Sequence, residues 1–282
     1  MDITPLWLVV NAASGSNSDA AVHDVTVALA HAGCAPARTV RFPDEDLPTR
    51  DLLEREGVAT LAIFTGDGTI NTATTRIEGW SGRVLVLPGG TQNLLSKSLH
   101  GDVPASDVVR AAVHDGGTKR LRVVRTSQGT SLVEVLAGPG AMWADVREGV
   151  RDLDFGTIAE SFSAAWRETT EGPGVRLANP AVGRAEGYRA VRIAPQNTQV
   201  LIEGYDFEDF GQFAAQGFAM LVKRDFRQGP HDDLGHFDCV TCRSDSPIAL
   251  MIDGERRQGG TEEHFVCEEF DLDFLATRSA GD

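Results

Sequence analysis

Residues 65–75 read TGDGTINTATT, and this stretch decides the fold because of what stands on either side of it. The run VATLAIF at 58–64 before it is apolar, rich in β-branched residues and of strand length, and the residues after it can form a helix. Glycine adopts backbone angles that other residues avoid and leaves amide groups open to an anion, so the glycines around Asp67 indicate a strand-to-helix turn. One carboxylate among open amides predicts a phosphate held with a metal ion.

The pattern of strand, small-residue turn and helix occurs twice more in the first 100 residues. The expected elements are strand 6–10, helix 18–32, strand 38–42, helix 48–56, strand 58–64, strand 83–88 and helix 94–99. Strands separated by helices pair in parallel, and the turns after them gather at one edge of the sheet, where open α/β folds bind ligands.

After about residue 120 the sequence becomes mostly β. The expected strands are 120–126, 130–137, 190–194, 198–203, 217–223, 237–242, 247–252 and 264–270. A helix is expected within 141–168, where an aromatic stripe is interpreted as either packed core or a lipid-facing surface. The length of the chain and the change in expected secondary structure near residue 120 together predict two domains, an α/β domain at 1–120 and a β-rich domain at 121–282.

Charge and hydropathy exclude several classes of protein. The net charge of −15 disfavours nucleic acid as the main partner. No apolar run is long enough to span a bilayer, and the N-terminal residues lack the features of a secretion signal, so a cytoplasmic protein is expected. Residues 83–126 are locally basic, which fits either a solvated surface or a face for phosphates or anionic lipid.

Cysteine and histidine give weaker signals for metal binding. The four cysteines are expected to be reduced, and Cys239 and Cys242 are half a zinc site with no second pair. The motif HDDLGH at 231–236 is interpreted as a polar turn or as a metal site.

Other phosphate-binding patterns are missing from the sequence. It contains no G-x-x-x-x-G-K-[ST] motif and no G-x-G-x-x-G after a strand. The alternative is a phosphate cradle made of three turns, one with Asn11, Ser14 and Gly15, one with Asp67, and one with Thr91 and Asn93.

Four motifs resemble the diacylglycerol kinase catalytic-domain family, which includes bacterial diacylglycerol, sphingosine and ceramide kinases. They are NAASGS at 11–16, TGDGTIN at 65–71, LPGGTQN at 87–93 and IDGE at 252–255, with a weaker match at DDLG, 232–235. The resemblance implies an NAD-kinase/diacylglycerol-kinase-like fold, with an N-terminal Rossmann-like parallel sheet and a C-terminal β-sandwich. It also implies ATP and magnesium in a cleft, with a lipid hydroxyl entering across it.

The resemblance also implies roles for particular residues. Asp67 matches the acid that organises the nucleotide phosphates and magnesium, Asp253 matches the base that accepts the proton of the lipid hydroxyl, and Asp233 matches a site for a structural ion. The implied nucleotide-binding residues are Asn11, Ser14, Gly15, Gly66, Asp67, Gly68, Thr69, Gly90, Thr91, Asn93 and Glu255.

The sequence departs from the family pattern at positions that contribute to metal binding in the family. Thr65 replaces a glycine, Thr72 and Leu94 stand where acids are usual, and another acidic position falls on Leu121 or Arg122. Fewer carboxylates predict a weaker magnesium network.

These observations predict an ATP-dependent lipid kinase acting on diacylglycerol, a ceramide or another long-chain alcohol during transient contact with a membrane surface. One alternative is a nucleotide-binding regulatory protein of the same fold with little or no catalysis. Another is an NAD kinase or phosphofructokinase, which LPGGTQN and IDGE disfavour. The sequence leaves the acceptor lipid open, and a homodimer is among the assemblies that it allows.

Overall fold

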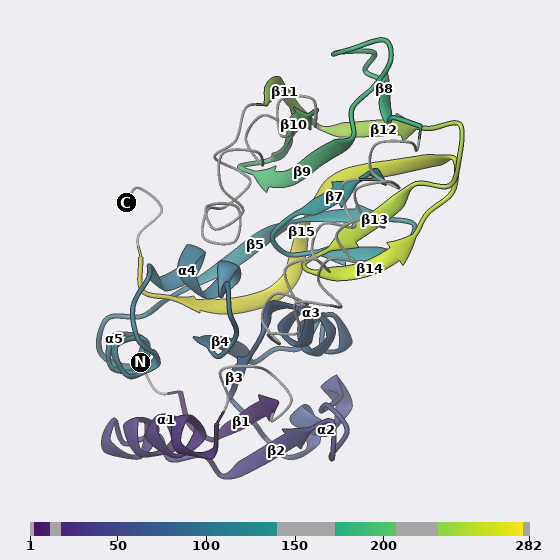
Figure 1. Ribbon diagram of the computed structural model, residues 1–282. Coiled ribbons are helices and arrows are strands. Elements are labelled where there is room, and N and C mark those ends of the chain that lie inside the picture. Colours follow the sequence, from purple (N-terminus) through teal and green to yellow (C-terminus); the bar gives the residue numbers. More distant parts are fainter. Residues whose placement is uncertain (1–2, 12–17, 140–172, 207–230, 279–282) are drawn as a thin grey trace, which may run out of the picture. The chain divides into compact units, whose positions relative to one another are not determined.

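The computed structural model describes residues 3–11, 18–139, 173–206 and 231–278, and the chain divides into two compact units (Figure 1). The first unit is Met1–Leu121 together with Glu269–Asp282, and the second is Arg122–Glu268. The predicted fold class, an α/β domain followed by a β-rich one, is confirmed. The boundary near residue 120 was expected, but the return of the last residues to the first unit was not.

The first unit is built on a parallel sheet. The strands lie in the order β2-β1-β3-β4-β15, and each hydrogen-bonds its neighbour in parallel. Its elements are β1 (Leu6–Asn11), α1 (Asp19–His31), β2 (Arg38–Phe42), α2 (Arg50–Arg55), β3 (Thr60–Thr65), α3 (Asp67–Arg76), β4 (Arg83–Pro88), α4 (Leu94–His100), α5 (Ala105–His114), β5 (Gly117–Thr126) and the C-terminal half of β15 (Glu262–Ala276).

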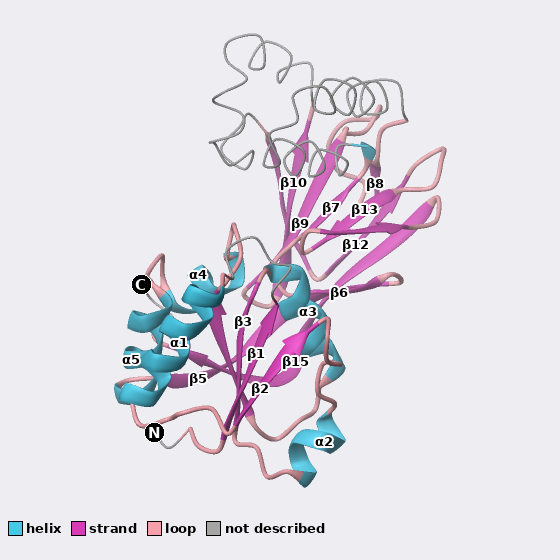
Figure 2. Ribbon diagram, turned by 60° about the horizontal axis from the view of Figure 1, so that its bottom comes forward, coloured by secondary structure: helices cyan, strands magenta, loops and turns pink. Residues whose placement is uncertain are grey.

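Alternating side chains of this sheet enter a shared core with two helices. Leu6, Leu8 and Val10 of β1 pack with the buried stripes of α1 and α5. Figure 2 shows these two helices on one side of the sheet and α3 on the other. The layout confirms the predicted α/β arrangement, in which the parallel strands β1, β3 and β4 end at one edge of the sheet.

The second unit is a sandwich of β-strands. One layer is a six-stranded sheet in the order β11-β10-β9-β7-β13-β14, and the other contains β8, β12 and the N-terminal half of β15, with β5 and β6. Its elements are β6 (Gly129–Ser131), β7 (Val135–Ala137), β8 (Arg176–Asn179), β9 (Ala190–Gln196), β10 (Gln199–Tyr205), β11 (Asp232–Phe237), β12 (Cys239–Arg243), β13 (Ala249–Ile252) and β14 (Glu255–Gln258).

Both layers of the sandwich contribute to one core. Val191 and Ile193 of β9 pack in the same apolar cluster as Val240 of β12 and Phe265 of β15. Because side chains alternate along a strand, Arg192 between them lies on the opposite face of the six-stranded sheet.

The structure differs from the expected elements at several places. The run 130–137 is not one strand, because residues 132–134 form a turn between β6 and β7. Residues 232–237 form an edge strand where a polar turn was favoured, and 105–114 form a helix that was not expected. The helix expected within 141–168 and the strand expected at 217–223 lie outside the described residues.

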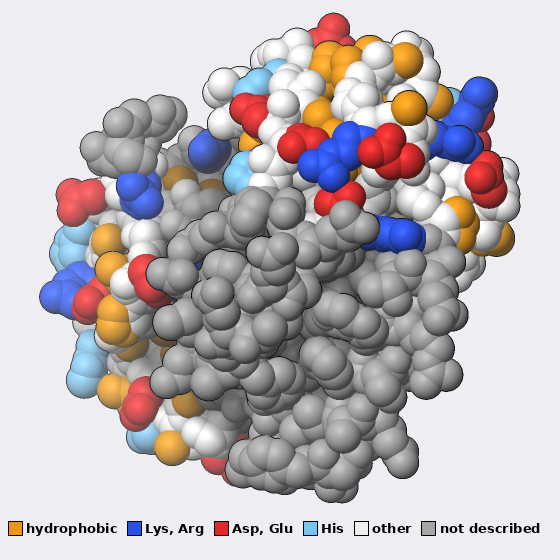
Figure 3. Space-filling model, turned by 45° about the horizontal axis from the view of Figure 1, so that its top comes forward, with side chains coloured by type: hydrophobic (Ala, Val, Ile, Leu, Met, Phe, Trp, Pro, Cys, Tyr) orange, Lys and Arg blue, Asp and Glu red, His pale blue; other side chains and the backbone are white. Residues whose placement is uncertain are grey.

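The basic segment at 83–126 is largely paired with acids. Arg120 lies 2.8 Å from Asp271 and 3.1 Å from Asp273, and Lys97 lies 3.4 Å from Asp102. On the face shown in Figure 3, basic and acidic side chains of the described residues lie next to one another. This pairing favours a solvated surface of mixed charge. Within the described part of the chain, no helix has both the length and the apolar character needed to cross a bilayer.

Candidate active site

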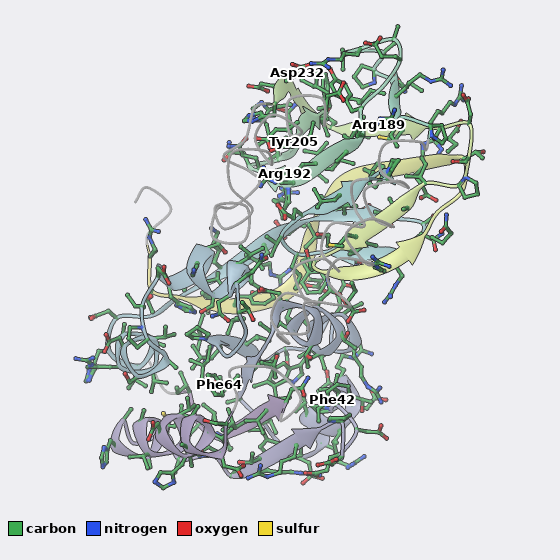
Figure 4. The ribbon with its side chains drawn as sticks, viewed as in Figure 1. Phe42, Phe64, Arg189, Arg192, Tyr205 and Asp232 are labelled. Carbon is green, nitrogen blue, oxygen red and sulfur yellow. The ribbon has the colours of Figure 1, made fainter. Side chains whose placement is uncertain are left out.

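Two of the predicted phosphate-binding turns meet where the strand order reverses. The chain runs from β1 to β2 on one side and then returns to place β3 on the other side of β1, which is the point where open α/β sheets bind ligands. Asn11 ends β1, and its Nδ2 donates to Oγ1 of Thr69, in the first turn of the helix α3 that follows β3, at 3.0 Å. Phe42 and Phe64 mark the neighbouring strand ends in Figure 4.

The third turn is joined to the second through Asp67. The backbone amides of Leu94 and Leu95 donate to the Asp67 carboxylate at 3.2 and 3.3 Å. These amides begin α4, whose N-cap Asn93 has a φ of 54° and gives no side-chain cap. Asp67 therefore supplies from a neighbouring turn the cap that the helix itself lacks.

Glycine is required where the second and third turns touch. A Cβ atom at Gly90 would lie 2.6 Å from the Cα of Gly66, a separation that real Cβ atoms do not show. Asn93 closes the third turn, because it accepts from the Gly90 amide at 2.7 Å and donates to the Gly90 carbonyl at 3.0 Å. Asn11 and the turns that contain Asp67 and Asn93 thus lie together within the first unit, whereas the rest of the first predicted turn lies outside the described residues.

The converged turns fit a phosphate group with a magnesium ion. Gly66 is the N-cap of α3 and has no side chain to bond the amides that begin this helix, which is the usual geometry of an anion site. Magnesium bound to a nucleotide typically takes one or two carboxylates and completes its shell with phosphates and water. Asp67 can supply one such carboxylate. No group of three metal-ligating side chains occurs within the ranges that the structure describes.

Asp253 lies in the second unit, in the hairpin between β13 and β14, with a φ of 47°. It is 5% exposed. Its Oδ1 accepts from the Ser131 hydroxyl at 2.6 Å and from the amides of Val133 and Glu134 at 3.0 and 3.1 Å, and its Oδ2 accepts from the Leu132 amide at 2.7 Å. The carboxylate is held in one orientation by the turn at 131–134.

Other predicted site residues have simpler surroundings. Glu255 follows the Asp253 turn and bonds Arg257 at 2.8 Å, and Asp233 accepts from the Gly235 amide at 3.0 Å. Ser14 and Gly15 lie outside the described residues. All four cysteines are free, and burial raises the pKa of Cys242 to about 12.

Sequence reasoning missed a buried ionic cluster on the outer face of the six-stranded sheet. Arg192 donates from Nε to Glu134 at 2.6 Å and from Nη1 to Glu203 at 2.8 Å, and the Tyr205 hydroxyl donates to Glu203 at 2.8 Å (Figure 4). Burial raises the pKa of Glu203, but the bonds from Arg192 and Tyr205 outweigh it and leave the pKa below its usual value. β9 and β10 each contain one charged residue, Arg192 and Glu203, among mostly apolar neighbours, and these single charges within strands were the available signal.

Comparison with known proteins finds a family match in the first unit. Residues 5–126 match the model of the diacylglycerol kinase catalytic domain, and this match contains all three turns of the first unit. No match was found among curated proteins.

Solved structures extend the likeness to the whole fold. A diacylglycerol kinase from Bacillus anthracis shares 13% identity over 96% of each chain, with a TM-score of 0.61. A candidate diacylglycerol kinase from the same organism shares 15% identity over 98% of each chain, with a TM-score of 0.64. At these identities the likeness establishes the fold.

Proposed function

We propose, from the premise that residues 5–126 match the diacylglycerol kinase catalytic domain, that this protein is an ATP-dependent lipid kinase. Its acceptor is the hydroxyl group of a membrane lipid such as diacylglycerol, a ceramide or another long-chain alcohol. The lipid is reached by peripheral contact with a membrane surface. The observation that carries the proposal is that Asn11, at the end of β1, and the turns with Asp67 and Asn93 come together at the reversal of strand order.

The first unit would bind the nucleotide. The amides that begin α3 face an anion without competition from a capping side chain, and the Gly66–Gly90 contact keeps the two turns close together. The bond between Asn11 and Thr69 joins the end of β1 to the first turn of α3. When bound, magnesium would neutralise phosphate charge beside Asp67, which orients the phosphates by its fixed position.

Asp253 would act on the acceptor. The lipid hydroxyl oxygen forms a bond to the γ-phosphorus, the bond from that phosphorus to the β–γ bridging oxygen breaks, and ADP leaves. The hydroxyl proton passes to the Asp253 carboxylate. Phosphoryl transfer depends on alignment and charge neutralisation more than on base strength, so a carboxylate held in one orientation suits this role.

The test is a panel of lipid micelles incubated with labelled ATP, magnesium and purified protein. We expect a phosphorylated lipid from at least one acceptor. Asp253→Asn is expected to abolish turnover while ATP binding, measured by thermal shift, is retained. Phosphorylation of NAD but of no lipid would replace the proposal with an NAD kinase, and full turnover by Asp253→Asn would remove Asp253 from its role.

A second candidate function is a nucleotide-binding regulator with little catalysis. Thr72 and Leu94 stand where the related family usually has acids, and in the structure Leu94 contributes only its backbone amide to Asp67. Thermal stabilisation by ATP together with no product on any lipid would favour this candidate.

A further inference from the structure

Asp253 and the turn at 131–134 bind each other at several points. The Asp253 carboxylate accepts from Ser131 and from three successive amides, and the Asp253 amide donates to the Glu134 carbonyl at 3.2 Å. Asp253 is separated from this turn by 119 residues or more in the chain. The orientation of its carboxylate therefore depends on where the turn is held.

Glu134 connects that turn to the neighbouring strands. Its backbone bonds Asp253, whereas its side chain, which is 9% exposed, accepts from Nε of Arg192 at 2.6 Å. Movement of the Glu134 side chain would displace an amide that binds the Asp253 carboxylate. One residue thus bonds both the candidate base and a buried guanidinium.

Arg192 is itself fixed on two sides. It bonds Glu134 and Glu203 with a side chain that is 16% exposed, and Tyr205 donates to the same oxygen of Glu203. Nε2 of His231 lies 3.9 Å from the other oxygen of Glu203. A planar guanidinium can bond two carboxylates at fixed angles, which a lysine ammonium cannot reproduce. Loss of Arg192 would leave two buried carboxylates facing each other.

We propose that Ser131 and Arg192 are positioning residues for Asp253, Ser131 by a direct bond to its carboxylate and Arg192 through Glu134. The importance of this arrangement for turnover rests on the proposed lipid-kinase function. The arrangement itself, a path of bonds from Arg192 through Glu134 to Asp253, rests only on contacts within the second unit.

The first test measures kcat and KM separately. Ser131→Ala and Arg192→Lys are each expected to lower kcat about ten- to hundredfold with the KM for ATP unchanged, because misplacement of a reacting group affects the chemical step. Ser131→Thr keeps the hydroxyl and is expected to restore most of kcat. A merely structural role would not give this rescue together with an unchanged KM.

Two matched controls exist in the same unit. Ser127 donates to the buried carboxylate of Glu263 at 2.7 Å, and Arg184 bonds Asp232 and Asp206 at 3.0 and 2.8 Å. Their partners are Glu263, Asp232 and Asp206, which are distinct from Asp253 and from the turn at 131–134. Ser127→Ala and Arg184→Lys remove the same kinds of bond, and we expect kcat to remain within about twofold of the wild type, as for substitutions away from the reacting groups.

A second readout does not require activity. Hydrogen exchange of the amides at 132–134 is expected to become faster in Ser131→Ala and Arg192→Lys, and to stay unchanged in the two controls. Unchanged exchange in the test variants, or faster exchange with unchanged kcat, overturns the proposal. If exchange is faster in Ser131→Ala and Arg192→Lys, but the wild-type protein phosphorylates no lipid, the positioning of Asp253 is supported and the proposed lipid-kinase function is overturned instead.

Discussion

Asp67 has two tasks that one substitution can separate. Its carboxylate caps α4 through the amides of Leu94 and Leu95, and it is the residue that we assign to the nucleotide phosphates and magnesium. An asparagine in its place keeps one oxygen acceptor but loses the negative charge that favours a helix N-terminus. Helix capping and nucleotide binding should therefore respond to this change to different extents.

We predict that Asp67→Asn lowers the free energy of unfolding by about 1 kcal/mol, the usual scale of a lost cap. The same variant should weaken magnesium-dependent ATP binding by on the order of tenfold or more, because a metal ligand is lost. Urea unfolding and titration with ATP measure the two effects. Asp51→Asn, an exposed acid in the first turn of α2, is the control. Equal ATP affinity in Asp67→Asn and wild type would contradict the assignment.

His100 predicts a pH dependence of stability. It is buried at the end of α4, with Nδ1 3.1 Å from Oγ1 of Thr277. Burial lowers its pKa to about 4, against a smaller opposing effect of the Val86 carbonyl. The folded pKa lies below the unfolded one, so the unfolded state takes up the proton first as pH falls. The stabilisation is complete above about pH 6.5 and is lost toward about pH 4.

Acidification from about pH 8 to about pH 5 should remove about 2 kcal/mol of stability through this histidine. His100→Gln should flatten the dependence of the unfolding free energy on pH by that amount, whatever it costs at neutral pH. His31→Gln, at an exposed position at the end of α1, is the control. An unchanged slope in His100→Gln would show that the side chain is not buried as a neutral group.

The contact between the second and third turns depends on two glycines. Gly90→Ala would place a methyl group 2.6 Å from the Gly66 Cα, so one turn must move. We predict a loss of about 1–3 kcal/mol, the usual cost of overpacking. ATP binding should weaken in parallel, because the phosphate turns separate. The measurements are urea unfolding and the ATP-induced thermal shift.

Gly117→Ala is the matched control, since no atom lies within 4 Å of the Cβ that it adds. It should change stability by less than about 0.5 kcal/mol and leave ATP binding unchanged. Normal ATP binding by Gly90→Ala would mean that the two turns do not need to touch for nucleotide recognition.

The elements that the sequence predicted are those with local signals. The strands of the first unit are short apolar runs followed by glycine-rich turns, and α1 shows Val22, Val25 and Leu29 at helical spacing. The helix α5 was also readable, from Pro104 at its N-cap and the apolar stripe behind it. These local signals were sufficient to predict α5.

Other features depend on distant contacts and were not readable. The run 130–137 contains Leu132, Val133, Val135 and Leu136, yet it breaks because three of its amides bond Asp253 more than 100 residues away. The strand β11 is polar, and among the described strands it pairs with β10 alone, at the edge of its sheet, so its sequence resembles a turn. The residues of the candidate site divide in the same way between those with a local motif and those that depend on distant contacts. Motifs identified Asp67 and Asp253, whereas Ser131 and Arg192 follow only from the fold.

At the scale of the whole chain, the boundary between the units falls inside single strands. β15 contributes Phe265 to the core of the second unit and runs on to pair with β4 in the first, where Phe274 is fully buried. The residue at the division is Glu269, in the middle of the strand. Two phenylalanines of one strand therefore stabilise different units, which allows the independence of the units to be measured.

We predict that Phe274→Leu and Phe265→Leu each lower stability by about 1–2 kcal/mol, as is usual for a buried side chain made smaller, but with different patterns of hydrogen exchange. Phe274→Leu should speed exchange in β3 and β4, and Phe265→Leu in β8 and β12, because each leucine weakens the packing of its own unit. Each variant is the control for the other. ATP should slow exchange in β3 and β4 of both variants, since the phosphate turns follow those strands. If both variants instead speed exchange equally throughout the chain, the two units unfold as one, and the shared strand couples their stabilities despite the separate cores.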